Sequence, residues 1–131
     1  MRTEMFHDAR VFPIGAGPHV SKAISFYHGD SRAHWEGDTL VVDTTNFSPN
    51  GSVRGSSDGL HLTEKFRRVA ADTLEYYLTF EDPTTWSRPW TMMIPLKNTG
   101  EKMFEYACHE GNYGMRAILS GARADEAAKQ P

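Results

Sequence analysis

Cysteine is nearly absent from this sequence, in which Cys108 is the only one among 131 residues. A single cysteine cannot form an intrachain disulfide, and it excludes a zinc site built from several thiolates. Long hydrophobic runs are also missing, since no apolar stretch approaches the roughly 20 residues that span a bilayer. Residues 1–9 alternate charged and apolar side chains and contain no hydrophobic segment of a signal peptide. We therefore expect no membrane span, while the compartment stays open.

A basic excess is absent as well. The chain has 14 basic and 17 acidic residues, which gives a formal net charge of −3. A nucleic-acid-binding surface normally requires a basic patch or stripe, so we expect no nucleic-acid partner. The hydrophobic share of 39% and the charged share of 24% are typical of a globular chain that buries one moderate core. A small-molecule ligand or substrate is the expected partner, and a homodimer is compatible with this composition.

Alternation of apolar and polar residues is the main pattern that the sequence does contain. It predicts strands at residues 39–45, 60–69, 73–82, 90–98 and 102–110, joined into antiparallel hairpins by turn residues. Glu36-Gly37-Asp38 suits a tight turn before the first of these strands. Pro95 lacks an amide donor, which places its strand at an edge or a bulge. Residues 47–59 are rich in Gly, Ser, Asn and Asp and predict a long exposed loop of the kind that borders binding sites.

The period changes after Glu110. Asn112 can cap a helix, and Met115, Ile118 and Leu119 follow helical spacing, with Gly121 placed to end the helix. The predicted fold is mainly β, a small antiparallel β-barrel or sandwich of the calycin-like kind with one C-terminal helix. We expect a single domain over residues 1–131, with residues 1–5 and 122–131 as frayed tails.

Glu64 interrupts an apolar strand face that it shares with Leu62 and Phe66. A carboxylate in such a place must be paired, hydrogen-bonded or protonated. Two interpretations follow, an ion pair with Arg10 or Arg68 and a role in general acid–base catalysis.

Cys108 and His109 are adjacent, but neighbouring residues of a regular strand point to opposite faces, so adjacency does not make them a catalytic pair. A nucleophilic cysteine needs a base within hydrogen-bond reach. We therefore interpret Cys108 as a small buried apolar residue. His109 and Glu110 are kept as candidates for catalysis.

Six histidines are present, and none forms the H-E-x-x-H spacing of zinc peptidases. A metal site would have to be assembled across strands, and His7, His61 and His109 are the candidate ligands for a divalent metal ion. The leading functional hypothesis is a small hydrolase acting on an ester or a lactone. Water would be activated by that metal ion or by a carboxylate, and the catalytic candidates are Glu64, His109 and Glu110.

Aromatic residues support an alternative, a non-catalytic module that binds a carbohydrate or a hydrophobic small molecule. A rim of aromatic and arginine side chains can stack on a flat ligand. The candidates are Trp86, Arg88, Trp90, Tyr106 and Tyr113. A small β-domain also needs aromatic residues in its core, and packing accounts for about half of them.

The segments WEGDTLVV (residues 35–42), EDPTTWSRPW (81–90) and YACHEGNYGM (106–115) resemble a widespread family of bacterial proteins with no established activity. The resemblance extends over residues 6–124. Members of that family are often longer at the N-terminus and frequently predicted to be exported, so the resemblance implies that export is an option. The motif residues that it implies are His7, Asp8, Arg10, Trp35, Glu36, Asp38, His61, Glu64, Trp90, His109, Glu110 and Asn112.

Overall fold

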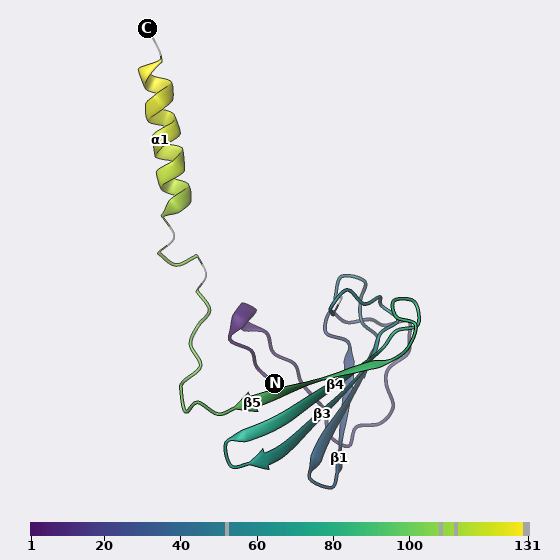
Figure 1. Ribbon diagram of the computed structural model, residues 1–131. Helices are drawn as coiled ribbons and strands as arrows, with labels where there is room; N and C mark the ends of the chain where they lie inside the picture. Colours follow the sequence, from purple (N-terminus) through teal and green to yellow (C-terminus); the bar gives the residue numbers. More distant parts are fainter. Residues whose placement is uncertain (52, 108, 112, 130–131) are drawn as a thin grey trace. The chain divides into compact units, whose positions relative to one another are not determined.

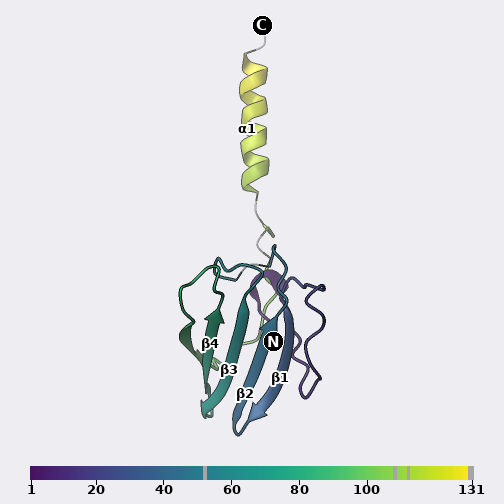
Figure 2. The ribbon, with the colours of Figure 1, turned by 90° about the vertical axis from the view of Figure 1, so that its right-hand side faces the viewer.

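Five antiparallel strands form one sheet in the computed structural model, which describes residues 1–51, 53–107, 109–111 and 113–129 (Figure 1). The strands are β1 (Asp30–Glu36), β2 (Thr39–Thr45), β3 (His61–Ala70), β4 (Thr73–Glu81) and β5 (Trp90–Lys97). The 3₁₀ helix η1 (Met5–His7) and the helix α1 (Gly114–Ala128) complete the regular elements. The order in the sheet is the order in the sequence, and Figure 2 shows β1 to β4 side by side.

The turn between β1 and β2 forms where the sequence predicts it. Glu36 pairs with Thr39, so only Gly37 and Asp38 connect the two strands. Gly37 has a φ of 61°, a left-handed conformation that glycine adopts without steric cost.

The mainly β class and the C-terminal helix are confirmed, but the sheet is open. Within the described residues, β1 and β5 are the two edges and no pairing joins them. The calycin-like barrel is therefore not confirmed. Segments before β1 run along the sheet instead, since Ile14 forms a bridge with Ala33 and Phe26 forms one with Phe47.

The predicted strand at residues 102–110 is wrong for the described part of that segment, in which residues 102–107 form no strand. Two of its backbone amides donate to side chains rather than to a neighbouring strand. The amide of Tyr106 donates to His7 Nε2 at 3.0 Å, and that of Phe104 donates to Glu4 Oε2 at 3.4 Å. Alternation alone does not distinguish a paired strand from an extended segment whose amides find other acceptors.

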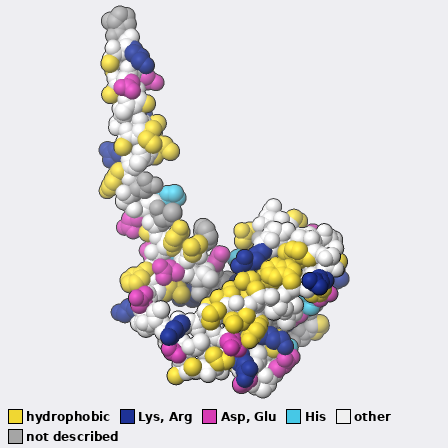
Figure 3. Space-filling model, viewed as in Figure 1, with side chains coloured by type: hydrophobic (Ala, Val, Ile, Leu, Met, Phe, Trp, Pro, Cys, Tyr) yellow, Lys and Arg dark blue, Asp and Glu magenta, His cyan; other side chains and the backbone are white. Residues whose placement is uncertain are grey.

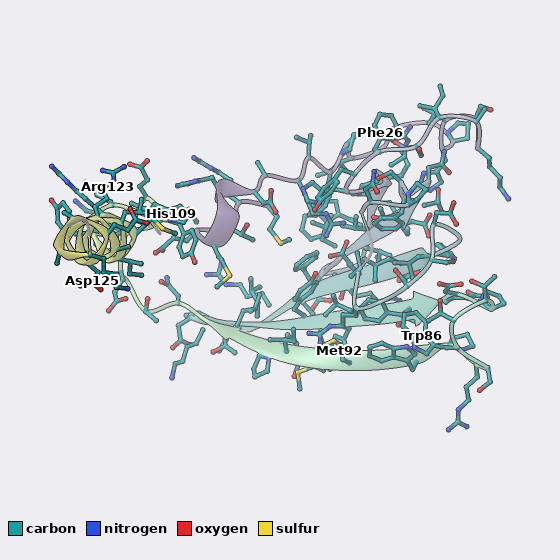
Figure 4. All side chains as sticks on the ribbon, turned by 90° about the horizontal axis from the view of Figure 1, so that it is seen from above. Phe26, Trp86, Met92, His109, Arg123 and Asp125 are labelled. Atoms are coloured by element: carbon teal, nitrogen blue, oxygen red, sulfur yellow. The ribbon has the colours of Figure 1, made fainter. Side chains whose placement is uncertain are left out.

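The chain divides into two compact units. The first contains Met1–Arg2 and Ala9–Lys102, and the second contains Thr3–Asp8 and Met103–Pro131. In the second unit, α1 continues past Gly121 through residues 122–128, which the sequence predicts as a tail. Arg123 and Asp125 project from opposite sides of this helix (Figure 4). The predicted cap Asn112 lies outside the described residues.

The core of the first unit lies on one face of the sheet. It consists of Phe47, Leu60, Leu62, Tyr76, Leu78 and Phe80. Phe47 and Leu60 come from the two ends of the connection between β2 and β3, so this connection covers the apolar face. Hydrophobic side chains also follow β5 on the surface (Figure 3), where Met93 and Leu96 are exposed. The face predicted for β3 and β4 is confirmed, because Leu62 and Phe80 are buried.

Gly51 makes close contact with the backbone of Tyr27. A Cβ at position 51 would lie 1.9 Å from the carbonyl oxygen of Tyr27, which backbone atoms cannot accommodate without movement. We expect Gly51→Ala to lower the free energy of unfolding by about 1–3 kcal/mol, measured by urea denaturation. Gly17→Ala is the matched control, since nothing lies within 4 Å of its added Cβ. Equal stability of the two variants would contradict this packing.

Candidate functional site

Carboxylate and imidazole groups alternate across one face of the sheet, opposite the apolar core. Asp30 comes from β1, Asp43 from β2, His61 from β3 and Glu81 from β4. His19 joins them from the segment that precedes β1. Strand alternation places the four strand residues on this face, because their neighbours Ser31, Thr44, Leu62 and Phe80 are buried.

Hydrogen bonds connect these groups in sequence. His19 Nδ1 lies 3.1 Å from Asp30 Oδ2, and His19 Nε2 lies 2.6 Å from Asp43 Oδ1. The other oxygen of Asp43, Oδ2, is bonded to His61 Nε2. His61 Nδ1 lies 3.7 Å from Glu81 Oε2, an ion-pair distance that exceeds a hydrogen bond. Asp43 is therefore shared by two histidines.

Both aspartates are held in the ionised form. Burial by itself raises the pKa of Asp43, but hydrogen bonds from His61 and His19 outweigh it and leave the pKa below its ordinary value. Burial also acts to raise the pKa of Asp30, and the Val20 amide, His19 and Arg32 together lower it. Each carboxylate can then accept hydrogen bonds from imidazole N–H groups at neutral pH.

A hollow of about 700 Å³ opens beside His61. Its wall combines charged, polar and apolar side chains: Lys22, Ser25, Thr45, Asn46, Phe47, Pro49, Asp58, Leu60 and His61, together with Gly59. This volume falls in the range of pockets that bind small molecules. It exceeds the hollows of about 420 Å³ beside Arg68 and beside Tyr27.

Asn46 fixes one wall of the hollow. Its side-chain amide donates to the carbonyl oxygens of Val20, Ser21 and Ile24, at 3.2, 3.1 and 3.0 Å. The segment that carries Lys22 and Ser25 is thereby attached to the end of β2. The amide has two N–H groups, which the three carbonyl oxygens share. The bridge between Phe26 and Phe47 holds the same segment beside the end of β2.

Asp82 holds the part of the wall formed by residues 58–61. Its carboxylate accepts hydrogen bonds from the amide and hydroxyl of Ser57 at 2.7 and 3.0 Å, and from the hydroxyls of Thr84 and Thr85 at 2.7 and 2.6 Å. Ser57 directly precedes the residues 58–61 that line the hollow. Burial acts to raise the pKa of Asp82, but these hydrogen bonds hold it well below its ordinary value.

Glu64 forms the ion pair that one interpretation of the sequence predicts, with Arg10 as its partner. Arg10 Nη1 lies 2.8 Å from Oε1 and Nη2 lies 2.6 Å from Oε2, and the hydroxyl of Tyr76 also donates to Oε1. The side chain of Glu64 is fully buried. Burial and the Glu64 carboxylate raise the pKa of Tyr76, so its hydroxyl stays protonated. Glu64 does not line the hollow, and its catalytic role stays a prediction.

The three predicted metal ligands belong to different units. His61 lies in the first unit, whereas His7 and His109 lie in the second. Within the described residues, no three or more His, Cys, Asp or Glu side chains are arranged to hold a metal ion. His7 Nε2 already accepts the Tyr106 amide. A metal site shared by these histidines stays a prediction.

The remaining catalytic candidates lie on the segment before α1. His109 and Glu110 are exposed there, and Figure 4 labels His109 at this place. Cys108 lies outside the described residues, so its predicted burial is not tested. Of the predicted site residues, only His61 borders the hollow.

The aromatic candidates do not gather around the hollow in the first unit. Trp90 stacks on Phe80 with ring centres 4.4 Å apart, and Trp86 meets Trp90 edge-on at 5.4 Å, while Arg88 is exposed beside them. Packing against the core therefore accounts for both tryptophans. Tyr106 and Tyr113 belong to the second unit.

Sequence reasoning missed His19, Asp30 and Asp43. Asp43 had one available signal, since alternation places it on the face opposite the buried Val42 and Thr44. Its proximity to His61 requires the register between β2 and β3, which a connection of fifteen residues does not reveal. His19 lies in a segment without strand or helix periodicity and carried no signal.

Among the helices of the described residues, none has the length and apolar character needed to span a bilayer. Comparison of the chain with protein-family models, with curated proteins and with solved structures finds no match.

Proposed function

We propose that the protein is a small hydrolase that cleaves an ester or a lactone in the hollow beside His61. The observation that carries this proposal is the bond between His61 Nε2 and Asp43, next to a hollow of about 700 Å³. A histidine held by a carboxylate through one ring nitrogen presents the other nitrogen as a proton acceptor. A small substrate would fit in the hollow beside His61, although the sheet is not closed into a barrel.

The proposed reaction uses His61 as general base and then as general acid. His61 Nε2–H donates to Asp43, which leaves a lone pair on Nδ1. Nδ1 takes a proton from a water molecule while the water oxygen attacks the carbonyl carbon of the substrate. When the C–O bond to the leaving group breaks, the imidazolium returns that proton to the leaving alkoxide. The products are a carboxylic acid and an alcohol, or a hydroxy acid from a lactone.

Charged residues in the hollow suit the other demands of this reaction. The ammonium group of Lys22 can stabilise the negative charge that develops on the carbonyl oxygen. Asp43 and Glu81 lie beside the imidazole, outside the lining of the hollow, and can stabilise the positive charge that the ring gains when it accepts a proton. Phe47 and Leu60 supply an apolar surface for the acyl or alkyl part of the substrate.

We expect His61→Gln to lower kcat/KM by about 10²–10⁴-fold, the usual contribution of a general base. The assay uses p-nitrophenyl esters of increasing chain length together with γ- and δ-lactones. His34→Gln is the matched control, because His34 is an exposed histidine of the same sheet that contacts Glu36 and does not line the hollow. Equal turnover by the wild-type protein and His61→Gln would remove His61 from the reaction.

A second candidate is binding without turnover, and one observation favours it. Both ring nitrogens of His61 face carboxylates, so a charged imidazole would serve as a donor rather than a base. The polar side chains of Ser25 and Asp58 in the wall, beside apolar Leu60, suit a carbohydrate. Saturable binding in calorimetric titrations with a panel of mono- and disaccharides, without hydrolysis of the ester panel, would favour this candidate.

A further inference from the structure

His19 connects the segment before β1 to the two strands that follow it. One ring nitrogen lies 3.1 Å from Asp30 on β1, and the other lies 2.6 Å from Asp43 on β2. Its side chain is 26% exposed, so the solvent screens these bonds only in part. The adjacent Val20 amide also donates to Asp30, at 3.0 Å. The polypeptide is thereby held to the sheet at two consecutive residues.

The geometry determines which form of His19 makes these bonds. Asp30 and Asp43 are ionised and can only accept hydrogen bonds. A neutral imidazole has one N–H and can donate to one of them, whereas the imidazolium donates to both. The titratable and charged groups around His19 are Asp30 and Arg32 from β1 and Asp43 from β2, with His61 and Glu81 beyond Asp43.

We propose that His19, as an imidazolium, is the positioning residue of the site. By binding Oδ1 of Asp43, it holds this carboxylate in the orientation in which Oδ2 accepts the Nε2–H of His61. The same two bonds attach His19 to the sheet. The segment that follows His19 carries Lys22 and Ser25, which form one wall of the hollow. The effect on catalysis rests on the proposed hydrolase function, whereas the effect on the ring of His61 does not.

The shared carboxylate gives this proposal a measurable consequence. Without His19, the side chain of Asp43 loses the bond that restrains Oδ1 and can rotate about its χ angles. The hydrogen bond from His61 to Asp43 is then present in only some of the side-chain conformations of Asp43. Exchange of the His61 ring proton with water therefore accelerates. The Val20 amide loses the adjacent anchor and becomes more accessible to exchange.

The test is NMR of the full chain labelled with ¹⁵N. In the wild-type protein we expect a slowly exchanging Nε2 proton on His61. In His19→Ala we expect its exchange to accelerate at least tenfold, together with that of the Val20 amide. His19→Gln, which keeps one donor, should fall between the two and serves as the measurement if His19→Ala does not fold. His34→Gln is the control and should leave both rates unchanged.

The turnover assay separates this proposal from the proposed function. We expect His19→Ala to lower kcat about tenfold while KM changes less, because Lys22 and Ser25 are still present. An exchange rate of the His61 ring proton that is equal in the wild-type protein, His19→Ala and His19→Gln would overturn the positioning role, whatever the turnover. Accelerated exchange in a protein that hydrolyses none of the esters or lactones would support the positioning role and contradict the hydrolase.

Discussion

Replacing Arg10 with methionine is expected to lower the free energy of unfolding by about 3–5 kcal/mol. The substitution keeps an apolar stem of similar length and removes the two guanidinium bonds to Glu64, 2.8 and 2.6 Å long. The Glu64 carboxylate has no exposed surface, so it would remain as a buried charge with Tyr76 as its main donor. Urea denaturation followed by circular dichroism measures the loss.

The control for this experiment is Arg67→Met. Arg67 lies 3.8 Å from Asp38, and both side chains are more than half exposed, so we expect a change below about 1 kcal/mol. A second control replaces the whole cluster, as Arg10→Met/Glu64→Leu/Tyr76→Phe. Because no buried polar atom of the cluster then lacks a partner, most of the lost stability should return. A loss in Arg10→Met as small as that in Arg67→Met would show that this pair does not hold the N-terminal segment on the sheet.

Replacing Asp82 with alanine is expected to lower the melting temperature by roughly 10 °C, since several hydrogen bonds to one charged group are lost together. The amides of Ser57 and Thr84 would lose their acceptor, and the wall of the hollow formed by residues 58–61 would lose its anchor. Differential scanning calorimetry measures the change. Thr91→Ala is the control, because its hydroxyl makes an exposed bond to Thr79.

Asp82 also predicts how stability depends on pH. Its pKa is lowered in the folded state, so the unfolded chain binds a proton first as the pH falls. The stabilisation is complete above the pKa of an unfolded aspartate, about 3.9, and is lost as the pH falls through the lower pKa of the folded state. Asp43 and Asp30 act in the same direction. We expect Asp82→Asn to be less stable than the wild-type protein at pH 7, with a difference that narrows below pH 4. A difference independent of pH between 7 and 3 would contradict this account.

Most of the sheet could be predicted from the sequence because its strands alternate clearly. The face of Leu62, Tyr76 and Phe80 is buried as the alternation indicates, and the turn at Gly37 follows from the glycine. The helical spacing of Met115, Ile118 and Leu119 predicted α1, although these three side chains are exposed. Its extent beyond Gly121 was missed because a glycine within a helix costs only about 1 kcal/mol, which helix formers on either side can offset.

The site was less predictable because its residues meet through contacts that are remote in the sequence. Glu64 had two arginine partners open to it, and only the course of the segment before β1 selects Arg10 over Arg68. The sequence placed His61 in a strand, but it did not show that Asp43 is its partner. The two side chains meet because of the register between β2 and β3, which their spacing in the sequence does not reveal. In the extended segment around Phe104, apolar and polar residues alternate, but its described residues do not pair with a strand. The alternation therefore predicted a strand that residues 102–107 do not form.

The sheet order β1-β2-β3-β4-β5 has a consequence for how the molecule forms. Each strand pairs only with its neighbours along the chain, so each hairpin can form from residues that are close in the sequence, an arrangement associated with rapid folding. Glu64 on β3 departs from this pattern, because its partner Arg10 lies 54 residues away. Arg10 is synthesised before Glu64, so the ion pair forms only when the segment around Arg10 packs against β3.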